Sequence, residues 1–122
     1  MDNFKKTLVL GGSLNPHRYS YKAIESLREH GLSVVSIGRK PGIVCDVKVV
    51  ETLYKENDID TVTIYLSQEN QKKYEDYILK LKPKRIIFNP GAENIRLYER
   101  ADSQGIEVMN ACTLVLLSLN QY

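Results

Sequence analysis

The residues of this sequence that are best suited to chemistry form one glycine-led run, Gly11-Gly12-Ser13-Leu14-Asn15-Pro16-His17-Arg18-Tyr19-Ser20. Glycine lets a backbone turn sharply and approach a ligand closely. The hydroxyl of Ser13 can donate to an anionic oxygen, and Arg18 adds a positive charge. This combination of residue types suits the binding of a phosphate group.

The spacing of the run can be laid over the dinucleotide fingerprint G-x-G-x-x-G, in which Gly11, Ser13 and Pro16 take the three glycine positions. Gly11 permits a tight turn, Ser13 is small enough for close backbone approach, and Pro16 presets the entry into a turn or helix. A helix that follows would direct the positive end of its dipole at the anion, beside Arg18. An ordinary strand-to-helix turn has a similar composition, so the run alone leaves both interpretations open.

A second loop, Gly38-Arg39-Lys40-Pro41-Gly42, carries two adjacent positive charges. Sites for NAD usually have an acidic residue about 20 residues after the glycines, where it binds the ribose hydroxyls. The stretch between His30 and Cys45 contains none. Arg39 and Lys40 would instead attract a phosphate on the adenosine ribose, which favours NADP or coenzyme A over NAD. A solvated basic turn is the alternative.

The elements that must position these loops follow from an alternation of short β-branched runs with amphipathic stretches. The expected strands are Thr7–Leu10, Ser33–Ile37, Thr61–Tyr65, Arg85–Phe88 and Glu107–Met109. Helical spacing joins Ala23 to Leu27, Tyr74 to Leu81 and Leu97 to Ala101; residues 46–57 are expected to add a short extended piece and a short helix, and residues 112–119 a last helix or an apolar arm.

This alternation predicts an α/β fold: a doubly wound, mainly parallel, five-stranded Rossmann-like sheet with helices on both faces, in one domain over residues 1–122. Sheets of this kind bind ligands at the carboxyl ends of their strands, near the point where the strand order reverses. Both loops described above follow expected strands and so belong to that edge.

Composition narrows the function classes. Net charge is +2 and 43% of the residues are hydrophobic, which is typical of a soluble globular protein and too weakly charged to favour nucleic acid or a membrane surface. No apolar run approaches the about 18 residues of a membrane span, and Met1–Lys6 does not begin a signal peptide. Cys45 and Cys112 match no metal or redox motif, so we expect free thiols and a cytoplasmic location.

Three motifs together resemble one family: Gly-x-Ser-x-x-Pro-x-Arg-x-Ser-Tyr at Gly11–Tyr21, Asn-Pro-Gly-Ala-Glu-Asn at Asn89–Asn94, and Asn-x-Cys at Asn110–Cys112. The chain resembles the small stand-alone CoA-binding proteins, which are similar to the nucleotide-binding domain of succinyl-CoA synthetase α subunits. The resemblance implies that the first loop wraps the CoA pyrophosphate and that the loop after the second strand lies by the adenosine phosphate. It also implies that the end of the third strand covers the adenine or pantetheine path. The motifs and the resemblance assign to the ligand site Gly11, Gly12, Ser13, Pro16, Arg18, Tyr19, Ser20, Arg39, Lys40, Tyr65, Pro90 and Gly91.

The function expected from the sequence is therefore binding of coenzyme A, or of an acyl-CoA, without catalysis of its own. No Ser-His-Asp arrangement and no cluster of metal ligands stands out, so we assign no catalytic and no metal-binding residue. An NADP-binding reductase, or a subunit of one, is the alternative. The expected partner is a small-molecule nucleotide, not nucleic acid or membrane; a homodimer through the apolar tail Leu114–Leu119, or an acyl-CoA enzyme as partner, stays open.

Overall fold

The computed structural model of the protein describes residues 5–122, so residues 1–4 of the stretch considered above for a signal peptide lie outside it. In chain order the strands are β1 (Lys6–Leu10), β2 (Ser33–Ile37), β3 (Gly42–Val44), β4 (Val47–Val50), β5 (Thr61–Ile64), β6 (Arg85–Phe88) and β7 (Glu107–Asn110). The helices are α1 (Tyr19–Glu29), α2 (Gln68–Gln71), α3 (Glu75–Leu81), α4 (Ile95–Ser103) and α5 (Thr113–Ser118), with a 3₁₀ turn η1 (Lys72–Tyr74) between α2 and α3.

The strands form one sheet in the order β3-β4-β2-β1-β5-β6-β7. All pairings are parallel except that of β3 with β4, which is antiparallel. The chain moves outward from β1 to β2 and β4, then returns to β5 on the other side of β1 and continues to β6 and β7. The order of the strands therefore reverses between β1 and β5, and this is where a sheet of this kind opens a crevice for a ligand.

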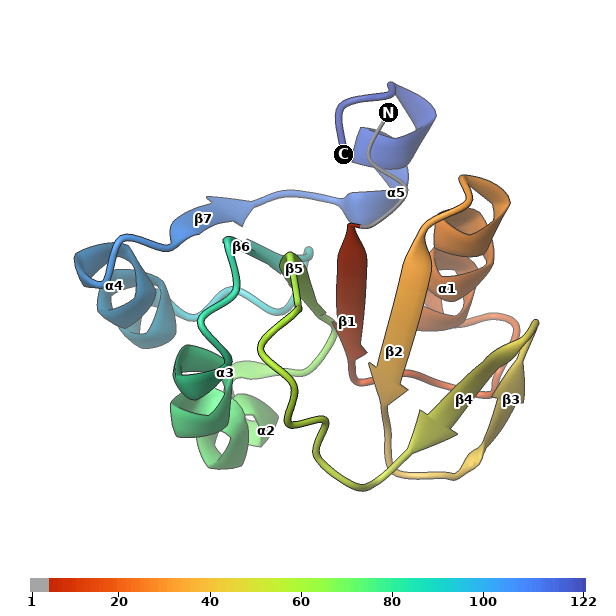
Figure 1. Ribbon diagram of the computed structural model, residues 1–122, viewed down its shortest axis with the longest axis horizontal. Helices are drawn as coiled ribbons and strands as arrows, with labels where there is room; N and C mark the ends of the chain where they lie inside the picture. Colours follow the sequence, from red (N-terminus) through yellow and green to blue (C-terminus); the bar gives the residue numbers. More distant parts are fainter. Residues whose placement is uncertain (1–4) are drawn as a thin grey trace.

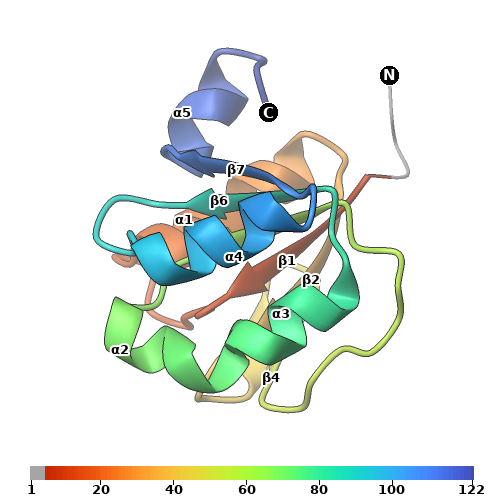
Figure 2. The ribbon, with the colours of Figure 1, turned by 90° about the vertical axis from the view of Figure 1, so that its left-hand side faces the viewer.

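Helices cover both faces of the sheet, as the alternation in the sequence predicts. Figure 1 shows α2, α3 and α4 on one side and α1 and α5 on the other, and Figure 2 gives the same arrangement from the side. Within residues 5–122, no helix combines the length and the apolar character that crossing a bilayer requires.

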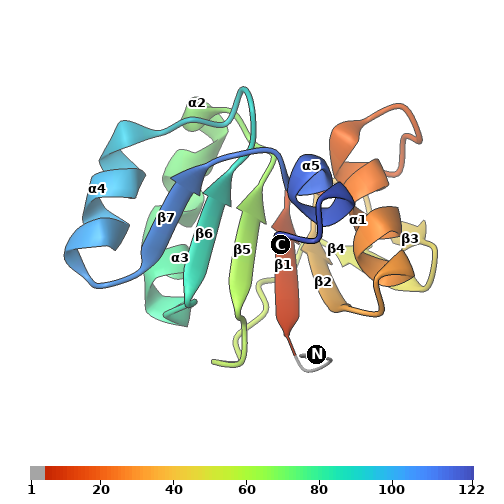
Figure 3. The ribbon, with the colours of Figure 1, turned by 90° about the horizontal axis from the view of Figure 1, so that it is seen from above.

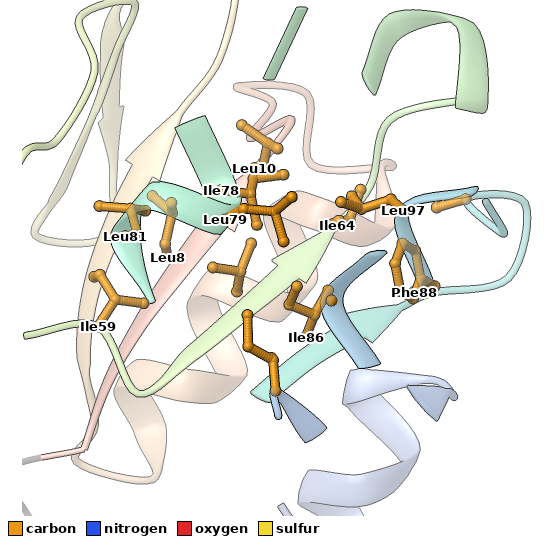
Figure 4. Close-up of a cluster of buried hydrophobic side chains, with 14 of the residues drawn as sticks. Leu8, Leu10, Ile59, Ile64, Ile78, Leu79, Leu81, Ile86, Phe88 and Leu97 are labelled. Atoms are coloured by element: carbon orange, nitrogen blue, oxygen red, sulfur yellow. The ribbon is translucent and has the colours of Figure 1, made fainter. Parts of the chain in front are cut away.

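The central strand β1 shows why both faces need cover. Leu8, Val9 and Leu10 are completely buried, and successive side chains of a strand point to opposite faces. Leu8 and Leu10 join the core beneath α3, where they lie near Ile78 (Figure 4), whereas Val9 packs with Ile24 on the opposite face. A continuous apolar run is therefore stable here because each of its side chains is removed from water.

Two predicted features of the middle of the chain are wrong. The sheet has seven strands and not five, because β3 and β4 form a hairpin that extends it beyond β2. The short helix expected within residues 46–57 is absent: β4 supplies the extended piece, and residues 51–60 are irregular. Val47 and Val49 bury their side chains while Lys48 stays exposed, which is the alternation of a strand with one face in the core and one in solvent.

Burial of three tyrosines makes the stability of the protein depend on pH in alkaline solution. Burial raises the pKa of Tyr77 to about 12 and raises the pKa values of Tyr65 and Tyr122. An unfolded tyrosine loses its proton near pH 10. The folded state keeps those protons to a higher pH than the unfolded state does. The stabilisation that results is complete below pH 10 and is lost as the pH rises through the pKa values of the folded tyrosines.

We therefore expect the free energy of unfolding to fall between pH 10 and about 12. Urea unfolding at a series of pH values would measure this decrease, and absorbance at 295 nm would follow the tyrosines. The Tyr77→Phe variant is the control and should show a shallower decrease. Titration of all eight tyrosines together near pH 10 in the folded protein would contradict the prediction.

Candidate functional site

A cleft of about 880 Å³ opens at the carboxyl edge of the sheet. Figure 3 shows the arrowheads of β1, β5, β6 and β7 directed to that edge, from which the loops that enter α1, α2 and α4 depart. These three loops and the loop between β2 and β3 line the cleft. Its place at the reversal of strand order is the place that the topology predicts for a ligand.

The glycine-led loop begins with two glycines that must pass close to the end of β2. The backbone N–H groups of Gly11 and Gly12 both donate to the carbonyl oxygen of Ile37, at 2.8 and 2.9 Å. Gly11 has φ of +95°, which favours glycine, and a Cβ atom on Gly12 would lie only 2.0 Å from the Oγ atom of Ser36. A side chain at position 12 would therefore displace the hydroxyl of Ser36, which donates to the carbonyl oxygen of Val9.

Beyond the glycines, the loop is held by its own polar side chains. The N–H of Asn15 donates to Oγ of Ser13 at 3.0 Å, and the N–H of His17 donates to Oδ1 of Asn15 at 3.0 Å. The N–H of Arg18 donates to the carbonyl oxygen of Asn15, also at 3.0 Å. These bonds give the loop a defined shape before any ligand arrives.

The start of α1 is left without a side-chain cap. Arg18 occupies the N-cap position of α1 and makes no capping hydrogen bond, whereas Ser67 and Asn94 cap α2 and α4 with their side chains. Arg18, Tyr19 and Ser20 line the cleft. The first turn of α1 therefore presents N–H donors and the positive end of a helix dipole to this cleft, which is the arrangement that binds an anion.

The charges around the cleft have one sign. Its ionisable side chains, apart from the tyrosines, are Arg18, Arg39, Lys40 and Lys73, and no Asp or Glu is among the described residues that line it. Because several positive charges share one concave surface, the local potential attracts an anion although the net charge of the chain is only +2.

All of the site residues predicted from the sequence line this cleft, with the exception of Pro16. Pro16 is exposed in the turn before α1. Tyr65 follows β5 and forms part of the wall. It packs against the buried cluster that includes Val9 and Ile24, and its buried hydroxyl has no hydrogen-bond partner among the described residues.

The cleft also contains residues that the sequence analysis did not assign to it. They are Leu14, Asn15, Ile37, Gly38, Leu66, Ser67, Asn70, Lys73, Tyr74 and Ala92. Gly38 and Leu66 lie just beyond predicted strands, so their position at strand ends could have assigned them to the cleft. Tyr74 begins the helical spacing that predicts a helix up to Leu81. It is half-buried, packs against the core beneath α3 and also lines the cleft.

The chain is similar to known proteins in sequence and in fold. A family model described as a CoA binding domain matches residues 5–118. A crystal structure of an uncharacterized protein is 44% identical to the chain with a TM-score of 0.93, and the match covers 98% of each chain.

Two more distant structures show the same fold. The cell-free ID.343 protein from Thermus thermophilus is 20% identical, with a TM-score of 0.83 over 97% of this chain and 90% of its own. A hypothetical protein from Pyrococcus horikoshii OT3 is 23% identical, with a TM-score of 0.81 over 92% of this chain and 80% of its own. The search of curated proteins finds no match.

Proposed function

Because this chain belongs to the CoA binding domain family, we propose that it binds coenzyme A, or an acyl-CoA, in the cleft at the carboxyl edge of the sheet. The observation that carries this proposal is the uncapped start of α1 behind a glycine-led loop, inside a cleft whose charged side chains are all cationic. Coenzyme A brings a diphosphate and a ribose 3′-phosphate, and both require this kind of environment.

The diphosphate has its counterpart in the loop from Gly11 to Ser20. The N–H groups at the start of α1 supply donors, and Ser13 and Arg18 supply a hydroxyl and a charge. The two glycine N–H groups are already bonded to Ile37. In this proposal the glycines therefore serve close approach, and the donors come from the rest of the loop and the helix.

The ribose phosphate has its counterpart in Arg39 and Lys40, which are exposed on the β2 side of the cleft. On the β5–β6 side, Leu66, Tyr74 and Ala92 give the wall apolar surface, beside the polar side chains of Ser67, Asn70 and Lys73. A ligand whose diphosphate lies over β1 would then have its adenosine phosphate on the β2 side and its pantetheine arm on the β5–β6 side. We assign the cleft to binding and not to turnover.

A thermal-shift titration with CoA, dephospho-CoA, NADP and NAD tests the proposal. Ligand at a hundredfold excess over its dissociation constant stabilises the folded state by about 2.7 kcal/mol. We expect CoA to raise the melting temperature more than the other three ligands at equal concentration. A shift with NADP and none with CoA would exclude coenzyme A as the ligand and favour the reductase alternative.

Replacing Arg39 and Lys40 together by alanine should weaken the binding of CoA by about tenfold and leave dephospho-CoA unaffected, because only CoA carries the ribose phosphate. Isothermal titration calorimetry with both ligands would measure the two losses. The variant with Lys48 and Lys55 replaced by alanine removes the same charge from exposed positions outside the cleft and serves as the control. Equal losses for both ligands would mean that Arg39 and Lys40 do not recognise the ribose phosphate.

A further inference from the structure

One buried amide side chain joins two walls of the cleft. The side chain of Gln71, at the end of α2, is completely buried. Its Nε2 atom donates to the carbonyl oxygen of Leu66 at 2.8 Å and to that of Ala92 at 2.7 Å. Leu66 belongs to the loop after β5 and Ala92 to the loop after β6, and both line the cleft. A single residue therefore fixes the separation of these two loops.

The orientation of this amide is set by the residues behind it. Nδ2 of Asn94 donates to Oε1 of Gln71 at 2.9 Å and to Oε2 of Glu75 at 3.1 Å. The oxygen of the Gln71 amide thus faces a donor, so its nitrogen must face the two carbonyl oxygens. Glu75 is buried and is held by Arg96 and Arg100, whose nitrogens lie 3.3 and 3.1 Å from its Oε1 atom.

Burying the side chains of Gln71 and Glu75 costs free energy, which their place beside the cleft explains. An amide and a carboxylate are removed from water, and each must be fully hydrogen-bonded to be tolerated there. The two bonds that the Gln71 amide donates are made to loop carbonyls at the cleft. The same segment carries Asn70, Lys73 and Tyr74 into the cleft wall. The network therefore orders the β5–β6 side of the cleft, opposite Arg39 and Lys40.

We propose that Gln71 is a positioning residue that sets the width of the β5–β6 half of the cleft for the pantetheine arm of the ligand. This inference rests on the proposed function and deepens it: the nucleotide half of CoA is held by charges and helix dipole, and the other half by the shape that Gln71 imposes. Removing the amide should therefore affect ligands that reach across β5 and spare ligands that end at the diphosphate side.

The Gln71→Met variant tests this, because methionine keeps the length and shape of glutamine and lacks its donors. Calorimetry with CoA and with adenosine 3′,5′-bisphosphate measures the two halves separately. We expect CoA to bind about tenfold more weakly and the bisphosphate to change by less than about twofold. An equal loss for both ligands, or unchanged CoA binding, would overturn the inference.

The Asn57→Leu variant is the matched control. The amide of Asn57 donates to the carbonyl oxygens of Lys80 and Leu81 at the far end of α3, and neither residue lines the cleft. This variant also loses two amide-to-carbonyl bonds, but away from the cleft, so it should leave both affinities unchanged. A loss of CoA affinity here similar to that of Gln71→Met would show that the effect is a general one of stability.

Hydrogen exchange on the unmodified chain provides a measurement that does not depend on the variant folding. CoA should slow exchange in residues 66–71 and 91–94 together, whereas the bisphosphate should not. Failure of CoA to protect these two segments, in a protein that does bind CoA, would refute the role of Gln71 and leave the proposed function unaffected. Failure of the unmodified chain to bind CoA at all would refute the proposed function itself.

Discussion

We expect the Ser13→Leu variant to bind CoA at least about a hundredfold more weakly than the unmodified protein while remaining folded. Ser13 lines the cleft between Gly12 and the start of the turn at Asn15. Leucine at this position would fill the space that a diphosphate needs and would remove the hydroxyl that could donate to it. Ser13 itself is not part of the buried core, so the cost to stability should be limited to the bond that Asn15 makes with Ser13, about 1 kcal/mol.

Calorimetry would measure the affinity, and thermal unfolding without ligand would confirm that the variant is folded. Ser103→Leu is the control: Ser103 is exposed on α4, where its hydroxyl donates to the carbonyl oxygen of Arg100. It should bind CoA like the unmodified protein. Unchanged affinity in Ser13→Leu would remove the glycine-led loop from the binding site.

The second large effect is expected at Gly38, where two of the loops meet. A Cβ atom on Gly38 would lie 2.2 Å from the carbonyl oxygen of Gly12. The carbonyl oxygen belongs to the backbone and the Cβ atom is attached directly to it, so neither can rotate away. An alanine would therefore force the loop after β1 and the loop after β2 apart. Overpacking of this kind typically costs about 1–3 kcal/mol. We expect Gly38→Ala to lose that much stability and to lose CoA affinity as well.

Urea unfolding and calorimetry on the same samples would measure both losses. Gly42→Ala is the control for the effect of adding a methyl group. A Cβ atom on Gly42 would lie 2.6 Å from a Cδ atom of the Leu14 side chain and not from a backbone atom. A side-chain end can move, so Gly42→Ala should be destabilised much less. Equal stability of the two variants would contradict the close approach of the loops at Gly12 and Gly38.

The predictable part of the fold is the part whose signal is local. The run at Leu8–Leu10 and the helical stripe from Tyr74 to Leu81 each require only the residues themselves and their neighbours. Helix ends were predictable for the same reason: α1 ends before Gly31, which has φ of +74°, and α3 ends at Leu81, before Lys82 in the left-handed region and Pro83. Each of these features has a steric cause that can be read from the sequence.

The hairpin of β3 and β4 could not be predicted in the same way. Its strands have three and four residues, and Gly42 begins the first of them. They are strands because β4 pairs with the end of β2, a contact that no local pattern reveals. The short helix expected after the extended piece is absent, because residues 51–60 are irregular.

In the candidate site, the residues found from sequence are those that directly follow strands or glycines. Lys73 was not found, because η1 brings it to the cleft and a turn of three residues has no recognisable pattern. Tyr74 begins the helical stripe, whose pattern predicts packing against the core and not a place in the cleft. Gln71 was missed for a different reason. Its role depends on the backbone carbonyl oxygens of Leu66 and Ala92. Every residue has such an oxygen, so the sequence does not indicate which of them accept a hydrogen bond.

The ends of the sheet have a consequence for how the protein behaves at high concentration. One margin is the three-residue strand β3, which turns antiparallel to its neighbour, and the other is the four-residue strand β7, where Glu107 is exposed. Short margins offer few unpaired backbone groups to a strand of another molecule, and Glu107 adds a charge at the β7 margin. Fibril-like growth by adding strands to this sheet is thereby disfavoured at both sides, and the largely parallel interior, which is slow to assemble, is shielded once it has formed.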